Sequence, residues 1–542
     1  MITSPSTRAA ERRRIRAPRE HGQVFIEPEW ERIGDALAAN RAQSLLDSGY
    51  DVHGQTLGDL GGCARREMLY EARRYTSQYR DVCDQGGHER PILLAGHQPQ
   101  LFHAGVWFKN FALSTLGQAH GAWAVNLLVD NDIHRMPSLR VPTGTRDNRQ
   151  IRVLPFDKPT DAIPYEEREI LDRPTFDTFG ARVDQAVSGL IRDPVIRQLW
   201  PLAVDAAQRS ANLGRCLAEA RHRLEGQWGQ QTLELPLSRV CQSPWFVRFA
   251  LHLLAELPRL HHVYNSCLAG YRHVNRIRSR RHPVPDLQVD EHGLEAPFWI
   301  WTAQSPHRQR LFVRPYADRL VLSDRERLSF TLPLDDPDAA VARWIERQPE
   351  GIRLRPRALI TTMYGRLVLS DLFLHGIGGA KYDQLTDLII QRFFGFKPPG
   401  YATISATALL FEDRTEALRE QMRELKRLQR DLRFHPERCL VPSEEAARLA
   451  SEKQAWIQKD PPRGHRLERH RAIQRINAAL QQHVAADPAP LAARLAELTA
   501  ELRHEVQFAS REFSFCLFPE HVLRPLLRCA RAAYTSAAPS PA

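Results

Sequence analysis

The stretch Pro91-Ile-Leu-Leu-Ala-Gly-His-Gln-Pro-Gln100 decides the fold class. Its first half is a short apolar run of the kind that forms a buried strand, and its second half is a polar loop. Aromatic and apolar side chains then recur at helical spacing over Val106–Leu116, and Trp123–Val129 is a second apolar run. Strand, loop, helix and strand in this order predict a βαβ unit with parallel strands.

The same pattern returns later in the chain. An apolar stretch, Leu359–Leu374, leads into a glycine-rich turn at His375–Gly379, and a helical pattern follows over Tyr382–Phe394. We therefore predict an α/β fold: a Rossmann-like core built on a parallel sheet, with helical insertions and a C-terminal helical hairpin or coiled coil. The expected segments are an N-terminal helical part (1–90), the core in two parts (91–160 and 236–410, the second with a β insertion), a helical insertion (161–235) and a C-terminal helical domain (411–535).

Composition narrows the class of protein. The 542 residues contain no apolar run of about 18 residues, and no apolar stretch follows the arginine-rich N-terminus, so we expect a cytoplasmic protein that does not enter a membrane. The net charge of +11 favours an anionic partner, although the arginines are spread along the whole chain. The eight cysteines form no CxxC pair, which argues against a zinc ribbon or a disulfide framework.

The loop from Gly96 to His103 is the first candidate site, because ligands of open parallel sheets bind at the carboxyl ends of the strands. Gly96 would let the backbone approach a ligand, and Gln98 is a polar group in the same loop. His97 and His103 are expected to position or protonate a phosphate. The alternative is a structural loop whose histidines bond only to the backbone.

The second candidate is the acidic turn Asp130–His134, at the end of the next apolar run. Its carboxylates could hold a metal that bridges phosphates, accept hydrogens from a substrate hydroxyl or amine, or act as a base. We assign Asp132 to catalysis, and Asp130 and His134 to substrate binding. An ordinary turn rich in Asp and Asn, capping a helix, is the alternative.

Two further features suit an anionic ligand. Gly376 and Gly378 resemble a phosphate cradle between strand and helix, although the spacing is neither GxGxxG nor a P-loop, and a tight turn with positive φ is the competing interpretation. The densest basic run lies at 272–282, where a helix would place Arg276 and Arg280 on one face to clamp phosphates or a dicarboxylate. A solvated surface helix is the alternative for this run.

Three of these stretches, in this order, resemble the bacillithiol biosynthesis cysteine-adding enzyme family over roughly 90–510. Ala95-Gly-His-Gln-Pro-Gln-Leu-Phe102 resembles that family's TGQQPGLF loop. Val125–Asp132 falls where the family has an apolar strand ending in an EDHD-type turn. Gly376-Ile-Gly-Gly-Ala-Lys-Tyr382 resembles its GPGEIAYW segment, sharing Gly376, Gly378 and Tyr382. The departures are His97 for the first glutamine, Gln100 for a glycine, Asn131 and Ile133 in the acidic turn with His134 offset by one, and Gly379 for a glutamate.

The resemblance implies a Rossmann-like core followed by a coiled coil. It also implies a ligase that adds cysteine to glucosaminyl malate, with ATP or another nucleotide and Mg²⁺ activating a carboxylate. The partners would be a small anionic metabolite and an amino acid. Independently of the resemblance, a helical hairpin of this length commonly mediates dimers, so the C-terminal helices are a candidate homodimer contact. Two other classes stay open: a nucleotide- or RNA-binding protein with a basic helical arm, and a scaffold built on the C-terminal helices.

Overall fold

The computed structural model describes residues 15–43, 49–82, 87, 89–134, 136–291, 293–459, 466–484 and 488–537. The chain divides into a larger unit, formed by the residues up to Ala408 and those from Arg511 onward, and a smaller unit, Leu409–Ser510. Within the described ranges, no helix is long and apolar enough to cross a membrane.

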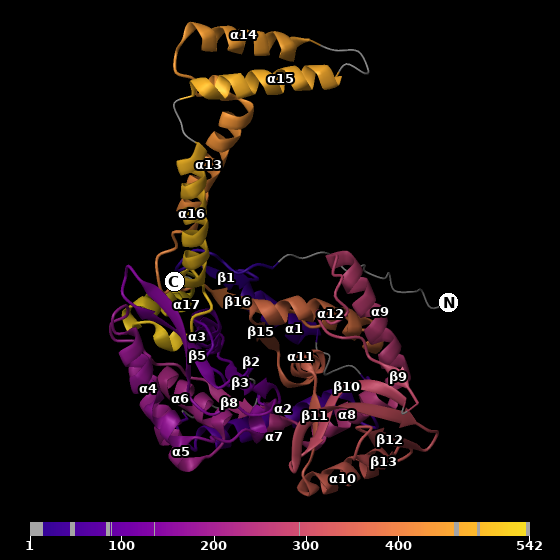
Figure 1. The fold of residues 1–542 in the computed structure, drawn as a ribbon. Coiled ribbons are helices and arrows are strands. Elements are labelled where there is room, and N and C mark those ends of the chain that lie inside the picture. The colour runs from indigo at the N-terminus through magenta and orange to yellow at the C-terminus, as the bar shows by residue number, and fades with distance from the viewer. Residues whose placement is uncertain are drawn as a thin grey trace, which may run out of the picture. The chain divides into compact units, whose positions relative to one another are not determined.

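The larger unit is built on a six-stranded sheet in the order β1-β16-β15-β2-β3-β8, of which the last five strands are parallel and β1 is an antiparallel edge (Figure 1). The chain runs from β2 to β3 and β8 on one side, and later from β15 to β16 on the other. The mixed α/β class and the parallel sheet are thus confirmed. The strands span Val24–Glu27 (β1), Ile92–His97 (β2), Trp123–Leu128 (β3), Leu233–Pro236 (β8), Leu372–His375 (β15) and Tyr401–Ala406 (β16).

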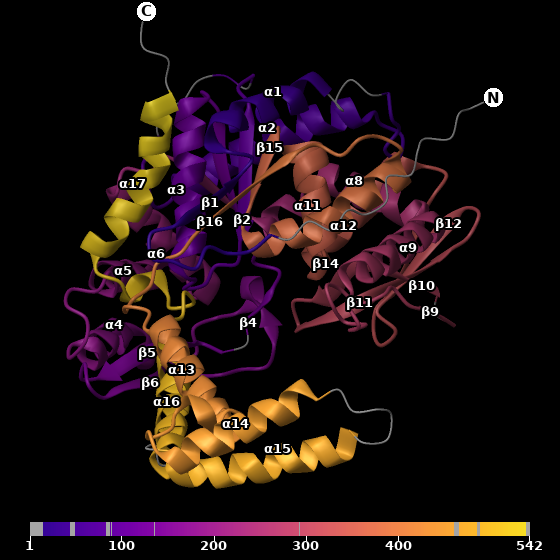
Figure 2. The ribbon, with the colours of Figure 1, turned by 90° about the horizontal axis from the view of Figure 1, so that it is seen from above.

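Helices cover both faces of this sheet. A Cβ on Gly117 of α3 would lie 2.8 Å from Ala124 of β3, so α3 packs on one face, whereas Gly365 lies against Phe373 and Leu94 on the other. Figure 2 shows α3 and α17 on one side of the strands and α11 and α12 on the other. The bounds are Ile33–Gln43 (α1), Leu57–Thr76 (α2), Ala104–Ala119 (α3), Leu237–Val240 (α7), Pro244–Ala255 (α8), Leu257–Asn275 (α9), Ala358–Tyr364 (α11), Ile377–Phe394 (α12) and Glu520–Ala537 (α17).

A second sheet, antiparallel, adjoins the carboxyl ends of the parallel strands. Its order is β13-β12-β11-β10-β14, with β9 paired to β10. The side-chain amide of Asn131 donates to the backbone oxygen of Pro356 at 2.9 Å, and Arg355 forms an ion pair with Glu166. The first contact ties the second sheet to the turn after β3, and the second ties it to the short segment that contains Glu166. The elements are Val289–Asp290 (β9), Gly293–Thr302 (β10), Ser305–Pro315 (β11), Arg319–Ser323 (β12), Ser329–Pro333 (β13), Pro337–Arg347 (α10) and Ile352–Pro356 (β14).

The expected helical insertion contains three helices that follow small antiparallel pairs of strands. Helix α4 is capped by Asp172, whose side chain accepts from the backbone N–H of Thr175, and Trp200 of α5 packs against Phe176 and Phe179 of α4. The bounds are Ile133–His134 (β4), Ser138–Gly144 (β5), Arg149–Pro155 (β6), Ile163–Pro164 (β7), Arg173–Val187 (α4), Ile196–Arg209 (α5) and Leu213–Gln227 (α6).

The smaller unit is helical. Helices α13 and α16 pack together, and so do α14 and α15, which lie side by side in Figure 1. Long amphipathic helices were expected here from the leucines three and four residues apart. The expected C-terminal domain reached residue 535, whereas the unit ends at Ser510 and α17 belongs to the larger unit. The helices span Thr415–Phe434 (α13), Glu444–Gln458 (α14), Arg466–Leu480 (α15) and Pro488–Phe508 (α16).

The structure corrects two expectations. The N-terminal part is not only helical, because β1 extends the parallel sheet. Helix α9 ends at Asn275, and Arg276 takes a left-handed conformation with φ of 55°, so Arg276 and Arg280 do not share a helix face. The cause is Arg272, whose guanidinium donates to the backbone oxygens of Arg280, His282 and Val284 and holds a loop rather than a helix at 276–284.

Candidate functional site

The candidate site lies where the parallel sheet reverses its strand order. Strands β2 and β15 are neighbours, and their chains leave in opposite directions across the sheet. Leu374 pairs with Ala95, so the loop after β2 and the turn after β15 start side by side. Crevices at such a switch point are where open α/β sheets bind ligands.

The loop after β2 rests on a buried lysine. The Lys109 ammonium group donates to the backbone oxygen of Gly96 at 2.8 Å, and its side chain is 1% exposed. Burial, and secondly the charge of Arg221, lower the pKa of Lys109 to about 7. His97 donates from Nδ1 to the backbone oxygen of Gln98 at 3.2 Å, and its ring meets the edge of Phe102. For His97, this bond agrees with the alternative interpretation, in which the histidines of the loop bond only to the backbone.

Gln98 and Asp132 come together, from the loops after β2 and β3. The Gln98 amide donates to Oδ2 of Asp132 at 2.9 Å, and Arg308 of β11 donates to Oδ1 of the same carboxylate at 3.2 Å. Arg308 is steadied by the ring of Trp299, 4.8 Å away. The Asp132 side chain remains 40% exposed, so a ligand can reach a carboxylate whose orientation two donors fix.

Asp130 has a different environment. Its carboxylate accepts hydrogen bonds from the backbone N–H and the hydroxyl of Ser238, at the start of α7. Burial, and then the charge of Glu166, raise the pKa of Asp130 to about 7. A carboxyl group that titrates near neutral pH is suited to proton transfer.

The turn after β15 leaves the start of α12 open. Helix α12 has 18 residues and begins directly after Gly376, which makes no side-chain capping bond. Gly376 and Gly378 would each have nothing within 4 Å of an added Cβ. Gly376 has φ of −77°, and neither Gly378 nor Gly379 is among the positive-φ glycines, so the tight-turn interpretation is wrong.

His375, the last residue of β15, lies beneath this turn. Its Nε2 is 2.6 Å from Oδ2 of Asp383, which also accepts from Arg366 at 2.9 Å and from Thr362 at 2.7 Å. Burial opposes the ionisation of Asp383, but the charges of His375 and Arg366 outweigh it and lower the pKa of the carboxyl. Asp383 is therefore a carboxylate, and it accepts the Nε2 hydrogen of the imidazole.

The remaining candidates lie at the edge of this site or outside it. His103 caps α3: its Nδ1 accepts from the backbone N–H of Gly105 at 3.0 Å. Tyr382, in the second turn of α12, has its ring 6.3 Å from that of His282. Arg276 and Arg280 are exposed on the loop after α9. His134 pairs through its backbone with Ile163, and its side chain lies outside the described residues.

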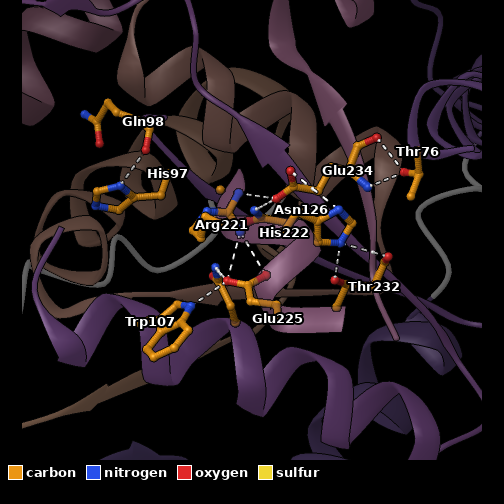
Figure 3. Close-up of polar contacts among 12 residues, drawn as sticks. Thr76, His97, Gln98, Trp107, Asn126, Arg221, His222, Glu225, Thr232 and Glu234 are labelled. Carbon is orange, nitrogen blue, oxygen red and sulfur yellow. Dashed lines mark hydrogen bonds and ion pairs between the residues drawn. The ribbon is translucent and has the colours of Figure 1, made fainter. Parts of the chain in front are cut away.

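A buried polar cluster lies behind the β2 loop (Figure 3). Among the described residues, His222, Glu225 and Glu234 are close enough to hold a metal ion. Arg221 instead donates to both oxygens of Glu225 at 2.9 Å and to Glu234, and Figure 3 shows its guanidinium between the two carboxylates. Because a cation already occupies this position, we assign the cluster to an internal ion-pair network rather than to a metal site.

Sequence reasoning missed several residues of this site. Lys109 is a single lysine within an aromatic helix, which is an unusual place for an unpaired charge and so was a usable signal. His375 stands directly before the glycine turn, but nothing in the sequence links it to Asp383. Arg308 and Ser238 reach the site through β11 and α7, from distant parts of the chain. Only the folded sheet brings them to Asp132 and Asp130.

Comparison with protein-family models and with curated proteins finds no match to this chain. The assignment of function therefore rests on the geometry of the site and on the short motifs described above.

Proposed function

We propose that the protein is a carbon–nitrogen ligase that joins an amino acid to a small acidic acceptor, with a Rossmann-like core and a C-terminal coiled coil. Cysteine and an aminosugar-malate-like acceptor are the substrates that the motif resemblance favours. The observation that carries the proposal is the pairing, at one switch point, of an oriented carboxylate with an uncapped glycine turn. The carboxylate would bind an amine, and the glycine turn at the start of α12 would bind an anion.

Asp132 and Asp130 would have different roles in the reaction, because their surroundings differ. Asp132, exposed and fixed by Gln98 and Arg308, would receive the ammonium group of the amino acid. Asp130 would take the proton that the amine must lose before it forms a bond to carbon, because its pKa of about 7 allows it to act as a base near neutral pH.

The donor set fits a nucleotide. The first backbone N–H groups of α12 and the open space at Gly376 and Gly378 suit a phosphate. A nucleotide bound there would supply the phosphoryl group that activates an acceptor carboxylate. The exposed Arg276 and Arg280 would add positive charge at the rim.

We also propose that α13 and α16 mediate a homodimer, since paired amphipathic helices of this length commonly associate. Analytical ultracentrifugation of the full chain would test this. A monomer at micromolar concentration would contradict it.

The direct test is detection of product by mass spectrometry after incubation with cysteine, glucosaminyl malate, ATP and magnesium. A cysteinyl adduct is expected with the native chain and not with Asp132→Ala. The variant should keep its melting temperature, because Asp132 is partly exposed. Adduct formation by Asp132→Ala at the native rate would refute the role of this residue. No adduct from the folded native chain would refute the proposed substrates.

A second function, nucleic-acid binding, is favoured by one observation. The loop after α9 exposes four arginines within six residues. If they bind a nucleic-acid backbone, affinity must fall steeply as salt rises. A gel shift with single-stranded RNA at low salt tests this, and the absence of a shift would exclude it.

A further inference from the structure

The first turn of α12 has donors without acceptors. The backbone N–H groups at the start of any helix have no partner within the helix, and an uncapped start attracts anions. Gly376 offers no side chain to accept them, and the first of the α12 backbone bonds runs from Ala380 back to Gly376. The N–H groups of Ile377, Gly378 and Gly379 therefore remain available.

A second polar atom, Nδ1 of His375, points to the same turn from below. The His375 side chain is 3% exposed, and its Nε2 is committed to Asp383. A Cβ on Gly379 would lie 2.7 Å from Nδ1 of His375, so that nitrogen faces the first turn of α12. Within the part of the chain that the structure describes, Nδ1 has no hydrogen-bond partner. An imidazole nitrogen without a protein partner beside an open helix start can bond to a ligand there.

The orientation of this imidazole is set by a rigid support. Asp383 is held by Arg366 and Thr362, so the carboxylate cannot turn away from Nε2. Because Asp383 accepts the hydrogen on Nε2, a second proton on His375 must sit on Nδ1. The imidazolium would then donate from both nitrogens, to Asp383 on one side and to an anion at α12 on the other.

A basic loop lies beside the same turn. Tyr271 of α9 donates to the backbone oxygen of Lys381, and the His282 ring lies 6.3 Å from that of Tyr382, which places the loop after α9 next to the start of α12. The Arg272 guanidinium fixes this loop through three backbone oxygens and Asp286. The exposed arginines that it presents are Arg276, Arg278, Arg280 and Arg281.

We propose that the first turn of α12 and Nδ1 of His375 together bind one phosphate group, and that the arginine loop 276–281 binds the next phosphate of the same chain. The ligand class is thus a polyphosphate, either inorganic or carried by a nucleotide. This deepens the nucleotide part of the proposed function, on which it rests, by assigning His375 and the arginine loop to the phosphates.

The test is isothermal titration of the full chain with inorganic pyrophosphate and, separately, with ATP. Gly378→Ala adds a methyl group to space that no protein atom occupies, so the fold should be kept while the phosphate position is obstructed. Affinity for both ligands should fall about tenfold or more, as expected for the loss of charge-assisted hydrogen bonds. Gly270→Ala is the matched control, because Gly270 is an equally open helical glycine in α9.

The variant His375→Gln tests the role of Nδ1 separately from that of Nε2. The longer amide can still donate to Asp383 in place of Nε2, but it has no atom at the position of Nδ1. We expect the melting temperature to stay near the native value and pyrophosphate affinity to fall about tenfold. Native affinity in both Gly378→Ala and His375→Gln, with both proteins folded, would overturn the proposal. Tighter binding of ATP than of pyrophosphate would identify the nucleotide as the source of the phosphates.

The two proposals fail in different ways. Pyrophosphate binding that depends on Gly378 and His375, without any cysteinyl product, would leave the phosphate site intact and refute the ligase. Product formed at the native rate by a folded Gly378→Ala variant, with unchanged ATP affinity, would support the ligase and refute the phosphate site.

Discussion

Two strand–turn–helix segments stand side by side in the parallel sheet, and they differ in how the helix begins. After β2, a six-residue loop ends in His103, which caps α3, and the backbone N–H of Phe515 donates to the oxygen of Phe102 at 3.0 Å. After β15, α12 starts at once, without a cap. In sequence both segments are polar, glycine-containing turns between an apolar run and a helix.

The difference shows that a turn at the carboxyl end of a strand is not by itself an anion site. The α3 terminus uses its donors internally and is covered by the segment that follows Arg511, so its contribution to the site is the Gln98 amide that orients Asp132. The α12 terminus keeps its donors and its open space. The following predictions test this contrast, from the largest expected effect to the smallest.

Removing the cation behind the β2 loop should have the largest effect. Arg221→Met leaves Glu225 and Glu234 buried beside each other without their counter-charge, which should cost about 3–5 kcal/mol of unfolding free energy. Denaturant unfolding of the full chain measures it. Arg223→Met, on the same helix but pairing with the half-exposed Asp205, is the control and should cost about 1 kcal/mol or less. Equal losses in the two variants would mean that Arg221 does not compensate the charge of the two buried carboxylates.

The pH dependence of stability should report Asp130. Its pKa is raised to about 7 in the folded protein, so between pH 4 and 7 the folded state binds more protons than the unfolded state. Stability from this group is therefore present at low pH and lost as pH rises through 7. Asp130→Asn should flatten this fall, and unfolding curves at pH 5 and pH 8 would show it. Because the side chain is partly exposed, screening keeps the change below that of a fully buried carboxyl. An unchanged slope would show that Asp130 titrates normally.

A capping side chain at the start of α12 should remove the difference between the α12 and α3 helix starts. Gly376→Ser places a hydroxyl where it can accept from the N–H of Gly378 or Gly379, which should raise stability by a few tenths of a kcal/mol. The same bond removes donors from the phosphate, so pyrophosphate affinity should fall. Calorimetric titration and thermal melting of one preparation test both parts. Unchanged affinity would mean that these N–H groups do not bind the ligand.

Removing the cap from α3 should have the smallest effect on pyrophosphate affinity. His103→Ala frees the N–H of Gly105 and should cost about 1 kcal/mol, the usual loss for an N-cap. Because His103 does not face the crevice at α12, pyrophosphate affinity should stay at the native value. A loss of affinity with little change in melting temperature would instead assign His103 to ligand binding.

The sequence was informative about elements and less so about partners. The apolar runs at 91–95 and 123–129, the helical spacing between them and the glycine turn at 376 are local patterns, and they correctly predicted a parallel sheet with candidate residues at its carboxyl edge. The closeness of the loops after β2 and β3 followed from that placement, but the bond between Gln98 and Asp132 did not. The basic run at 272–282 misled, because a guanidinium that bonds to three carbonyl oxygens can replace a helix by a loop.

What could not be predicted depends on contacts distant in the chain. Arg308 and Ser238 reach the two carboxylates from a second sheet and a short helix, and no spacing in the sequence relates them. The capped and uncapped helix starts also looked alike, because a histidine is an uncommon cap. The dyad of His375 and Asp383 has an eight-residue separation that only the turn of α12 brings to bonding distance.

Hydrogen–deuterium exchange, followed by mass spectrometry with and without ATP and magnesium, tests the central contrast most directly. The amides at 377–379 should exchange more slowly when ATP is bound, because ligand oxygens accept their hydrogens, whereas those at 104–109 should not change. Protection at the start of α3, with none at the start of α12, would contradict phosphate binding at α12. It would place the phosphate site in the loop after β2 instead.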